Sequence, residues 1–494
     1  MRLCTLPSSV LYGADSSDLS LQNIQQIRSV KHSWTTAYPT SRILRQDHSV
    51  TDRQIQPGFA HSSVLTIRRA VRDETFDRGS RMLEKSHSWP PAIDTSLGRM
   101  TCVLPGLCIG SVLRERELVF VFAGIPLRRI PWSMVLCIVA LMALGLSGIS
   151  RADELNDGPN LFSKQVNWML FAIPALVASL SVPYRTWKSM GYLLFALSMP
   201  LLLVVFLMPR RNGAQCWIQL GYFDVQPSEI VKLTFILALA QYLMYRENHR
   251  RASGLIAPFA ITAVPLILIL REPDLGSAML FIPVLFAMLF AAGARPRHLA
   301  FVALLGVFLS PLFWLKMNPE QKSRVVALFS QADGQANPGG DRWHQHQSKL
   351  VMSLGGAYGS ETSGPILEDP DAYRLFAAQT DFVFCMIGER WGLVGGIVTL
   401  AIYLALFAKG FMIAAHTREP FGRLVAVGIV ALLATQTVIN TAMTVGLLPV
   451  VGITLPLMSY GGSSLLITAV ALGLLMNVGM RPGYEMTPEP FRFE

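Results

Sequence analysis

Charged residues are scarce in this chain. Only 15% of its 494 residues are Asp, Glu, Lys or Arg, whereas 52% are hydrophobic and the mean hydropathy is +0.42. Soluble domains carry about 25% charged residues. This composition therefore excludes an ordinary soluble protein and indicates that lipid forms part of the solvent of the folded chain.

Cysteine is also sparse, and its spacing excludes two classes of small fold. The six cysteines form no CxxC motif and no Cys/His cluster of the kind that zinc sites use. We therefore expect neither a disulfide framework nor a zinc site, and no redox activity. The cysteines are Cys4, Cys102, Cys108, Cys137, Cys216 and Cys385.

The net charge of +10 does not indicate nucleic-acid binding. The basic residues lie mostly in the N-terminal region and in short segments between apolar runs. This distribution is typical of the signal that orients membrane proteins. We therefore expect membrane lipid as a partner and no nucleic acid.

The first 115 residues differ from the rest of the chain. They are rich in Ser, Arg, Gln and His and show no sustained helical or alternating apolar period. They also lack the apolar core and cleavage site of a secretory signal. We interpret residues 1–115 as a disordered or accessory extension, and a later methionine such as Met100 is an alternative start of translation.

Residues 130–480 contain ten apolar runs of roughly membrane-spanning length. They predict an all-α, polytopic membrane protein with about ten transmembrane helices, followed by a short cytoplasmic tail at 481–494. The runs are 132–150, 166–183, 187–207, 228–244, 254–270, 274–293, 299–316, 381–408, 422–446 and 455–479.

The basic residues predict the orientation of these spans. An even number of spans places both termini on one side, and most basic connections fall on that side, which the positive-inside rule makes cytoplasmic. The long connection at 317–380, between helices seven and eight, then faces outward. Its length and its Gly, Ser, Gln and His content favour an extracytoplasmic lid or re-entrant segment over an aqueous cavity.

The first charged junction is the segment QPSEIVK. Pro227 and Ser228 are expected to open a helix, Glu229 to complement its positive dipole, and Lys232 to lie one turn further. One interpretation is a helix start with an ion pair between Glu229 and Lys232. The other is that Lys232 points into the bundle and contacts an anionic substrate group.

The second junction is the segment REPDLG. Pro273 at the first helical position and Asp274 in the first turn are typical of an ordinary helix start. Alternatively, Arg271, Glu272 and Asp274 form a charged cluster with Lys232. Such a cluster suits a diphosphate, a metal ion or mutual ion pairing.

The third junction, QTDF, lies where the long outward connection ends. We expect Thr380 to cap the eighth span and favour a functional role for Asp381, because a substrate entering from the outer leaflet would meet the protein there. Glu389 and Arg390 lie about 12 Å deeper. We interpret these two residues as a structural pair.

The fourth segment, residues 440–466, contains two prolines and a glycine pair. Pro449 and Pro456 break helices, and Gly461 and Gly462 allow backbones to approach closely. Its role is expected to be chiefly architectural. An alternative is that exposed helix ends here bind a headgroup or phosphate.

These motifs, GAQCW, QPSEIVK, EPDLG, QTDF with GLVGG, and LLPVVGITLPLMSYGGSSLL, resemble in order and separation the SEDS family, which includes RodA and FtsW. The resemblance implies a peptidoglycan polymerase that uses lipid II, a disaccharide-pentapeptide on undecaprenyl diphosphate, outside the bacterial cytoplasmic membrane. It also implies a class B penicillin-binding protein as the transpeptidase partner. The family's catalytic aspartate maps onto Asp381, the lysine of its QPSE-x-x-K motif onto Lys232 and the aspartate of its PDLG motif onto Asp274.

These assignments suit glycosyl transfer from a diphosphate-linked donor, which needs one carboxylate as general base. The leaving diphosphate needs charge stabilisation. Lys232, arginines such as Arg271 or Arg324, or a divalent cation such as Mg²⁺ or Mn²⁺ would provide it. Glu229 and Lys349 are further candidate substrate-binding residues, and the sequence predicts no particular metal ligands.

The chain departs from the family pattern at two places. Where the family typically has Arg before the Trp of the first motif, this chain has Cys216, and Arg210 or Arg211 would have to supply the missing charge. Before Asp381, the usual Leu-Pro-Glu and His are replaced by LFAAQ.

Two other functions compete with polymerisation. A lipid II flippase would also need a polar cavity and broken helices, although the motifs show no inverted repeat. A non-catalytic scaffold for a cell-wall transpeptidase is the third hypothesis. Between an elongation role of the RodA type and a division role of the FtsW type, the first motif and the VGLLPVVGITLPL stretch favour RodA slightly.

Overall fold

The computed structural model describes most of the apolar part of the chain. The described residues are 129–155, 160–209, 215–219, 221, 224–245, 252–329, 341–364 and 370–481. The expected N-terminal extension at 1–115, Arg210 and Arg211, and all of the C-terminal tail after Arg481 lie outside them.

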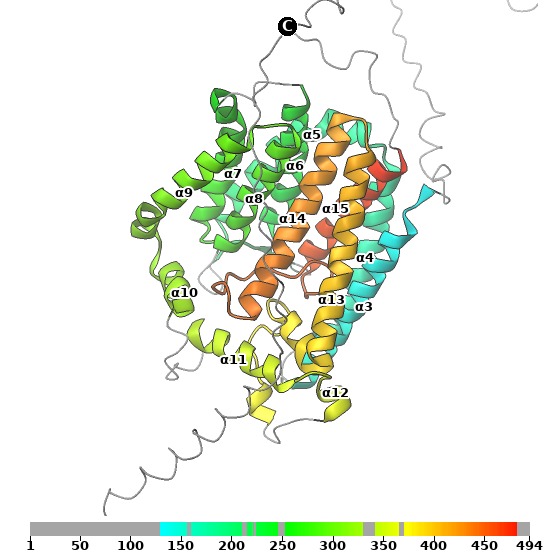
Figure 1. The fold of residues 1–494 in the computed structure, drawn as a ribbon, viewed down its shortest axis with the longest axis vertical. Coiled ribbons are helices and arrows are strands. Elements are labelled where there is room, and N and C mark those ends of the chain that lie inside the picture. The colour runs from blue at the N-terminus through cyan, green and yellow to red at the C-terminus, as the bar shows by residue number, and fades with distance from the viewer. Residues whose placement is uncertain are drawn as a thin grey trace, which may run out of the picture. The chain divides into compact units, whose positions relative to one another are not determined.

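The described residues form a bundle of long helices (Figure 1). Eight of these helices are long and apolar enough to cross a membrane, and α6 and α8 occupy the two remaining predicted runs. The all-α, polytopic membrane class is thereby confirmed, while the number of ten spans stays a prediction. The long helices are α3 (Trp132–Leu155), α4 (Leu161–Ser181), α5 (Tyr184–Val205), α6 (Pro227–Met244), α7 (Ile256–Arg271), α8 (Leu275–Ala291), α9 (Pro296–Lys316), α13 (Val383–His416), α14 (Pro420–Thr444) and α15 (Gly462–Met480).

The last helix begins later than its apolar run predicts. The run starts at residue 455, whereas α15 starts at Gly462. Pro449 and Pro456 lack the amide proton that a helix needs, and Gly452 has a φ of +68°, so the chain between α14 and α15 is irregular. This irregular segment, residues 448–461, is important for the site described below.

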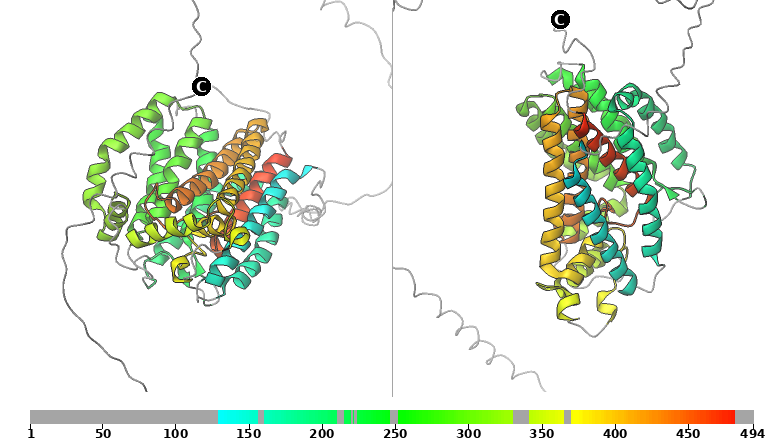
Figure 2. Two further views of the ribbon diagram at one scale, coloured as in Figure 1. Left: turned by 60° about the horizontal axis from the view of Figure 1, so that its bottom comes forward. Right: turned by 90° about the vertical axis from the view of Figure 1, so that its right-hand side faces the viewer.

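Among the eight long apolar spans, α14 and α15 are the most buried, with 72% and 78% of their apolar windows buried, whereas only 6% of the α9 window is buried. Figure 2 shows α9 at the edge of the bundle. Small residues allow the central helices to pack closely. A Cβ at Gly473 of α15 would lie 2.0 Å from Ser179 Oγ of α4, and one at Gly428 of α14 would lie 2.6 Å from Ile236 of α6.

The connection between α9 and α13 is partly helical rather than a structureless loop. α11 is joined to the end of α14 and to the irregular segment, since Ser348 Oγ donates to Thr444 O (3.1 Å) and Gln345 Nε2 donates to Leu448 O (2.9 Å). This connection therefore has a defined position at the end of the bundle where α13 begins. Its elements are α10 (Pro319–Phe329), α11 (Asp341–Leu354), α12 (Ser360–Ser363) and η5 (Pro370–Tyr373).

A short antiparallel hairpin precedes α6. β1 (Ile218–Gln219) pairs with β2 (Asp224–Val225), with Ile218 opposite Val225. Gln226 then forms the N-cap of α6. The hairpin thus sets the point at which the QPSEIVK segment enters the bundle.

Candidate functional site

The start of α6 contains the predicted ion pair. Lys232 Nζ lies 2.8 Å from Glu229 Oε1, and the two side chains are only 3% and 8% exposed. Pro227 stands at the start of the helix, as expected. Both interpretations of this segment are therefore compatible with the geometry, because Lys232 is paired and also points into the protein interior.

The start of α8 lies beside the start of α6. Asp274 is the N-cap of α8, and its Oδ1 accepts a hydrogen bond from the amide of Ser277 (2.9 Å). Its Oδ2 accepts a second hydrogen bond from Gln226 Nε2 (3.1 Å), and the hydroxyls of Ser228 and Ser277 are 3.3 Å apart. The prediction that Pro273 and Asp274 are the first helical residues is wrong by one or two positions, because the Asp274 carboxylate caps the helix from outside it.

Glu272 is the unusual residue of this junction. It is fully buried at the end of α7, and neither carboxylate oxygen has a hydrogen-bond partner. Burial, with a further contribution from the Asp274 charge, raises the pKa of Glu272 to about 8. Glu272 is therefore a neutral acid at pH 7.

The thiol of Cys216 lies near the same two acids. Burial raises the pKa of Cys216 to about 12, and the charges of Asp274 and Glu272 add to the effect. Cys216 stands where the resembled family has Arg. Within the described residues no ion pair joins Arg271, Glu272 or Asp274 to Lys232, which pairs with Glu229, and Arg271 is exposed at the end of α7.

Asp381 lies two residues before α13 and is half-buried. Burial raises the pKa of Asp381 to about 6, while a hydrogen bond from Thr380 and the positive charge of Arg324 act in the opposite direction. Arg324 is a half-buried residue of α10. The expected capping role of Thr380 is wrong, because the N-cap of α13 is Phe382 and the Thr380 hydroxyl donates to Ala377 O (3.3 Å).

The backbone of Asp381 is held by Asn440 of α14. The Asn440 amide donates to Asp381 O (2.8 Å) and to Ile453 O (2.7 Å), and Asn440 itself is fully buried. The Asn440 side chain therefore joins Asp381, two residues before α13, to the irregular segment. The sequence analysis did not single out Asn440 as a functional residue.

The irregular segment contacts both Asp381 and the start of α8. A Cβ at Gly452 would lie 3.6 Å from Asp381 Oδ2, and a Cβ at Gly276 would lie 2.5 Å from Val451 O. The Asp381 carboxylate and the first turn of α8 thus both lie beside the neighbouring residues Val451 and Gly452. This geometry agrees with the expected architectural role of the proline- and glycine-containing segment.

The remaining candidates lie in the connection between α9 and α13. Arg324 acts on Asp381 through its charge, as described above. Lys349 is a half-buried residue of α11, the helix that packs against α13. Both residues therefore belong to the end of the bundle that contains Asp381.

Glu389 and Arg390 have structural roles, but they do not pair with each other. Arg151 of α3 donates to both Glu389 oxygens, from Nε and Nη2, at 2.9 Å each. Arg390 Nε instead lies 3.0 Å from Glu361 Oε2. The sequence contains one sign of the pair between Arg151 and Glu389, because Arg151 is a charged residue at the end of an apolar run.

The described residues contain no preformed metal cluster. No group of three or more His, Cys, Asp and Glu side chains within them is arranged to hold a metal ion. Asp274 and Glu229 already have protein partners, as given above. A cation at this site would therefore need ligands from a bound molecule, as Mg²⁺ commonly takes from phosphates.

The sequence of this chain matches a known protein family. Residues 127–482 match the family described as "Cell cycle protein", which comprises FtsW, RodA and SpoVE. Among the relatives, a probable peptidoglycan glycosyltransferase FtsW of Geobacter metallireducens is 32% identical over 70% of this chain and 92% of its own length. Peptidoglycan glycosyltransferase RodA of Treponema pallidum is 30% identical over 70% of this chain and 97% of its own length.

Two solved structures have the same fold. A chain from a peptidoglycan synthase complex matches with a TM-score of 0.63 and 29% identity, over 72% of this chain and 99% of its own length. The rod shape determining protein RodA of Thermus thermophilus matches with a TM-score of 0.53 and 28% identity, over 72% of this chain and 98% of its own length. This chain therefore belongs to the FtsW, RodA and SpoVE family of polytopic membrane proteins.

Proposed function

We propose that this chain is a peptidoglycan glycosyltransferase that polymerises lipid II into glycan strands at the outer face of the bacterial cytoplasmic membrane. The relatives at 30% identity or more include proteins named peptidoglycan glycosyltransferase. The observation that carries the proposal is Asp381, a half-buried acid that is influenced by the charge of Arg324 and that lies, like the start of α8, against the irregular segment.

In this proposal Asp381 is the general base. Its carboxylate takes the proton of the acceptor sugar hydroxyl, whose oxygen attacks the anomeric carbon of the donor. The bond between that carbon and the diphosphate oxygen breaks, and the diphosphate leaves with the electron pair. A base with a pKa of about 6 is well matched to this task, because it is mostly ionised at neutral pH and still accepts a proton readily.

The leaving diphosphate needs positive charge rather than an acid. Lys232 is a cation held inside the bundle by Glu229, one turn along a helix that begins beside Asp274. Arg324 supplies positive charge on the Asp381 side. A divalent cation bound jointly by the diphosphate and one or two carboxylates, Asp274 included, would add to them.

The orientation and the partner belong to the same proposal. The positive-inside rule places both termini in the cytoplasm, so that Asp381 and the connection from α9 to α13 face outward. One structural relative is part of a peptidoglycan synthase complex. By analogy, we propose a class B penicillin-binding protein as the transpeptidase that crosslinks the glycan made by this chain.

The test is polymerisation of labelled lipid II by the purified protein together with its transpeptidase. Asp381→Asn should abolish glycan polymer, because the amide cannot accept the proton. Glu361→Gln is the matched control, since it neutralises a half-exposed acid whose ion-pair partner among the described residues is Arg390. Polymerisation by Asp381→Asn at the wild-type rate would contradict the catalytic assignment. Translocation of lipid II without polymer by the wild-type protein would favour a flippase, and neither activity would favour a scaffold.

A further inference from the structure

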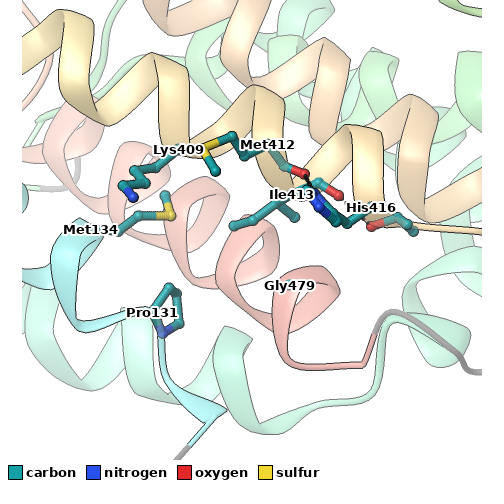
Figure 3. Close-up of a pocket in the computed structure, with 8 residues that line it drawn as sticks. Pro131, Met134, Lys409, Met412, Ile413, His416 and Gly479 are labelled. Atoms are coloured by element: carbon teal, nitrogen blue, oxygen red, sulfur yellow. Dashed lines mark hydrogen bonds between the residues drawn. The ribbon is translucent and has the colours of Figure 1, made fainter.

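A second candidate site lies at the other end of the bundle. A groove of about 180 Å³, open to the surroundings on one side, lies where α3 begins and where α13 and α15 end (Figure 3). In Figure 1 the cyan start of α3 and the red end of α15 lie at the top, whereas α11 and α12 lie at the bottom. The groove is lined by Pro131, Met134, Lys409, Met412, Ile413, His416, Thr417 and Gly479.

This groove is distinct from the site around Asp381. Asp381 comes just before the first residue of α13, whereas Lys409 and His416 are in the last two turns of the same helix. α13 is kinked at Gly392, and from that kink to Lys409 alone the helix axis covers about 25 Å. The groove therefore takes no part in the chemistry proposed for Asp381.

The walls of the groove are apolar. Met134 is fully buried, Ile413 lies against Gly479, where a Cβ would come within 2.9 Å of Ile413 Cδ1, and Met412 is half exposed. Methionine side chains are flexible and adapt to irregular apolar ligands. Trp132, 60% exposed at the start of α3, is a residue type that membrane interfaces favour. These walls suit a hydrocarbon chain near the interface.

The rim of the groove is positively charged. Lys409 is exposed about 10 Å from the end of α13, and no described residue forms an ion pair or hydrogen bond with it. Figure 3 shows its side chain extending across the groove toward α3. Arg129 and Arg418, both exposed, lie next to the start of α3 and the end of α13.

Negative charge is nearly absent from the same region. In the three helix ends, at residues 129–137, 405–419 and 472–481, Glu419 is the single acidic residue, and it is buried with its Oε2 bonded to the amide of Gly422. His416 adds an exposed polar ring, whose Nδ1 lies 2.7 Å from Met412 O. The rim therefore complements an anionic group.

We propose that this groove binds one anionic glycerophospholipid of the surrounding leaflet. One acyl chain lies against Met412 and Ile413, and Lys409 contacts the phosphate. A lysine within the apolar part of a span is costly unless its amine reaches a polar partner, and a lipid phosphate at the interface is such a partner. By the positive-inside rule this leaflet is the cytoplasmic one, whose lipids include anionic species.

The test measures lipid retained by the full chain. The protein is purified from nanodiscs of phosphatidylglycerol or of phosphatidylcholine, and retained lipid is counted by native mass spectrometry. We expect one phosphatidylglycerol per chain and at least fivefold less phosphatidylcholine. Lys409→Gln should lower phosphatidylglycerol retention at least fivefold, whereas Lys164→Gln, an exposed lysine at the start of α4, should leave it unchanged.

A second variant tests the groove itself. Met412→Trp fills the apolar wall and keeps the charge of Lys409, so it should also lower retention at least fivefold. A photoactivatable acyl chain should label peptides from the end of α13. Equal retention of the two lipids, unchanged retention in both variants, or labelling elsewhere would overturn the proposal. If the residues that precede Arg129 occupy the groove, the full chain will retain no lipid. That result would also overturn the lipid proposal.

Discussion

Replacement of Glu272 by Gln should stabilise this protein at alkaline pH and not at acidic pH. Glu272 is fully buried and its two carboxylate oxygens have no partner, so burial raises its pKa from 4.5 to about 8. In the unfolded chain the carboxyl ionises near its ordinary value. Between pH 4.5 and 8 the folded state therefore binds one more proton than the unfolded state does, and the free energy of unfolding falls as the pH rises.

The size of the effect follows from the difference in pKa. Each unit corresponds to about 1.4 kcal/mol, so the full cost of this carboxylate is on the order of 5 kcal/mol above pH 8. Below pH 4.5 the cost vanishes because the acid is protonated in both states. Gln is neutral at every pH and has nearly the same shape. The stability gain from Glu272→Gln should therefore grow from near zero at pH 4.5 to several kcal/mol at pH 8.5.

The measurement is unfolding by SDS in mixed micelles at several pH values, followed by tryptophan fluorescence. Glu361→Gln is the control, because its acid is half exposed and paired with Arg390, and should show no gain that increases with pH. Parallel stability curves for the wild type and Glu272→Gln across this range would refute the reasoning. They would mean that water or a cation reaches the Glu272 carboxylate in the folded protein.

Three further changes test other contacts. Arg151→Ala should destabilise the protein by about 3 to 5 kcal/mol, because it leaves Glu389 charged and buried; adding Glu389→Gln should recover much of this loss in the same SDS assay. Arg324→Gln should raise the pKa of Asp381, so the acidic limb of the polymerisation pH profile, which falls near pH 6 in the wild type, should move to higher pH. Gly452→Ala should cost about 1 to 2 kcal/mol, because φ is +68° there. The same SDS assay measures this loss, and the added Cβ, 3.6 Å from Asp381 Oδ2, would be in ordinary van der Waals contact with the carboxylate.

The spans were predictable because hydropathy is a local property. The predicted run at 228–244 and α6 at Pro227–Met244 differ by one residue. The ion pair of Glu229 with Lys232 was predictable for the same reason, since side chains spaced three residues apart on a helix lie next to each other. Helix ends that depend on dihedral angles were less predictable, and the start of α15 at Gly462 is an example.

Contacts between distant segments could not be read from the sequence. Arg151 and Glu389 are 238 positions apart, and the local neighbour Arg390 was the wrong choice of partner. The bond from Gln226 to Asp274 likewise depends on α6 and α8 beginning side by side. Asn440 shows the same limit, because its amide binds two backbone carbonyls from other segments. Neither carbonyl has a sequence signature.

The two hydrogen bonds of Asn440 go to backbone atoms, one of Asp381 and one of Ile453. Asn440 holds the carbonyl oxygen of Asp381, not its carboxylate. The position of Asp381 therefore depends on its backbone contact, whereas its chemistry depends on its side chain. A substitution that removes the Asp381 carboxylate can therefore leave the loop in place. A family member with such a substitution would be inactive but would still fold and assemble. The same separation makes Asp381→Asn an informative variant, since a loss of activity would not report a loss of structure.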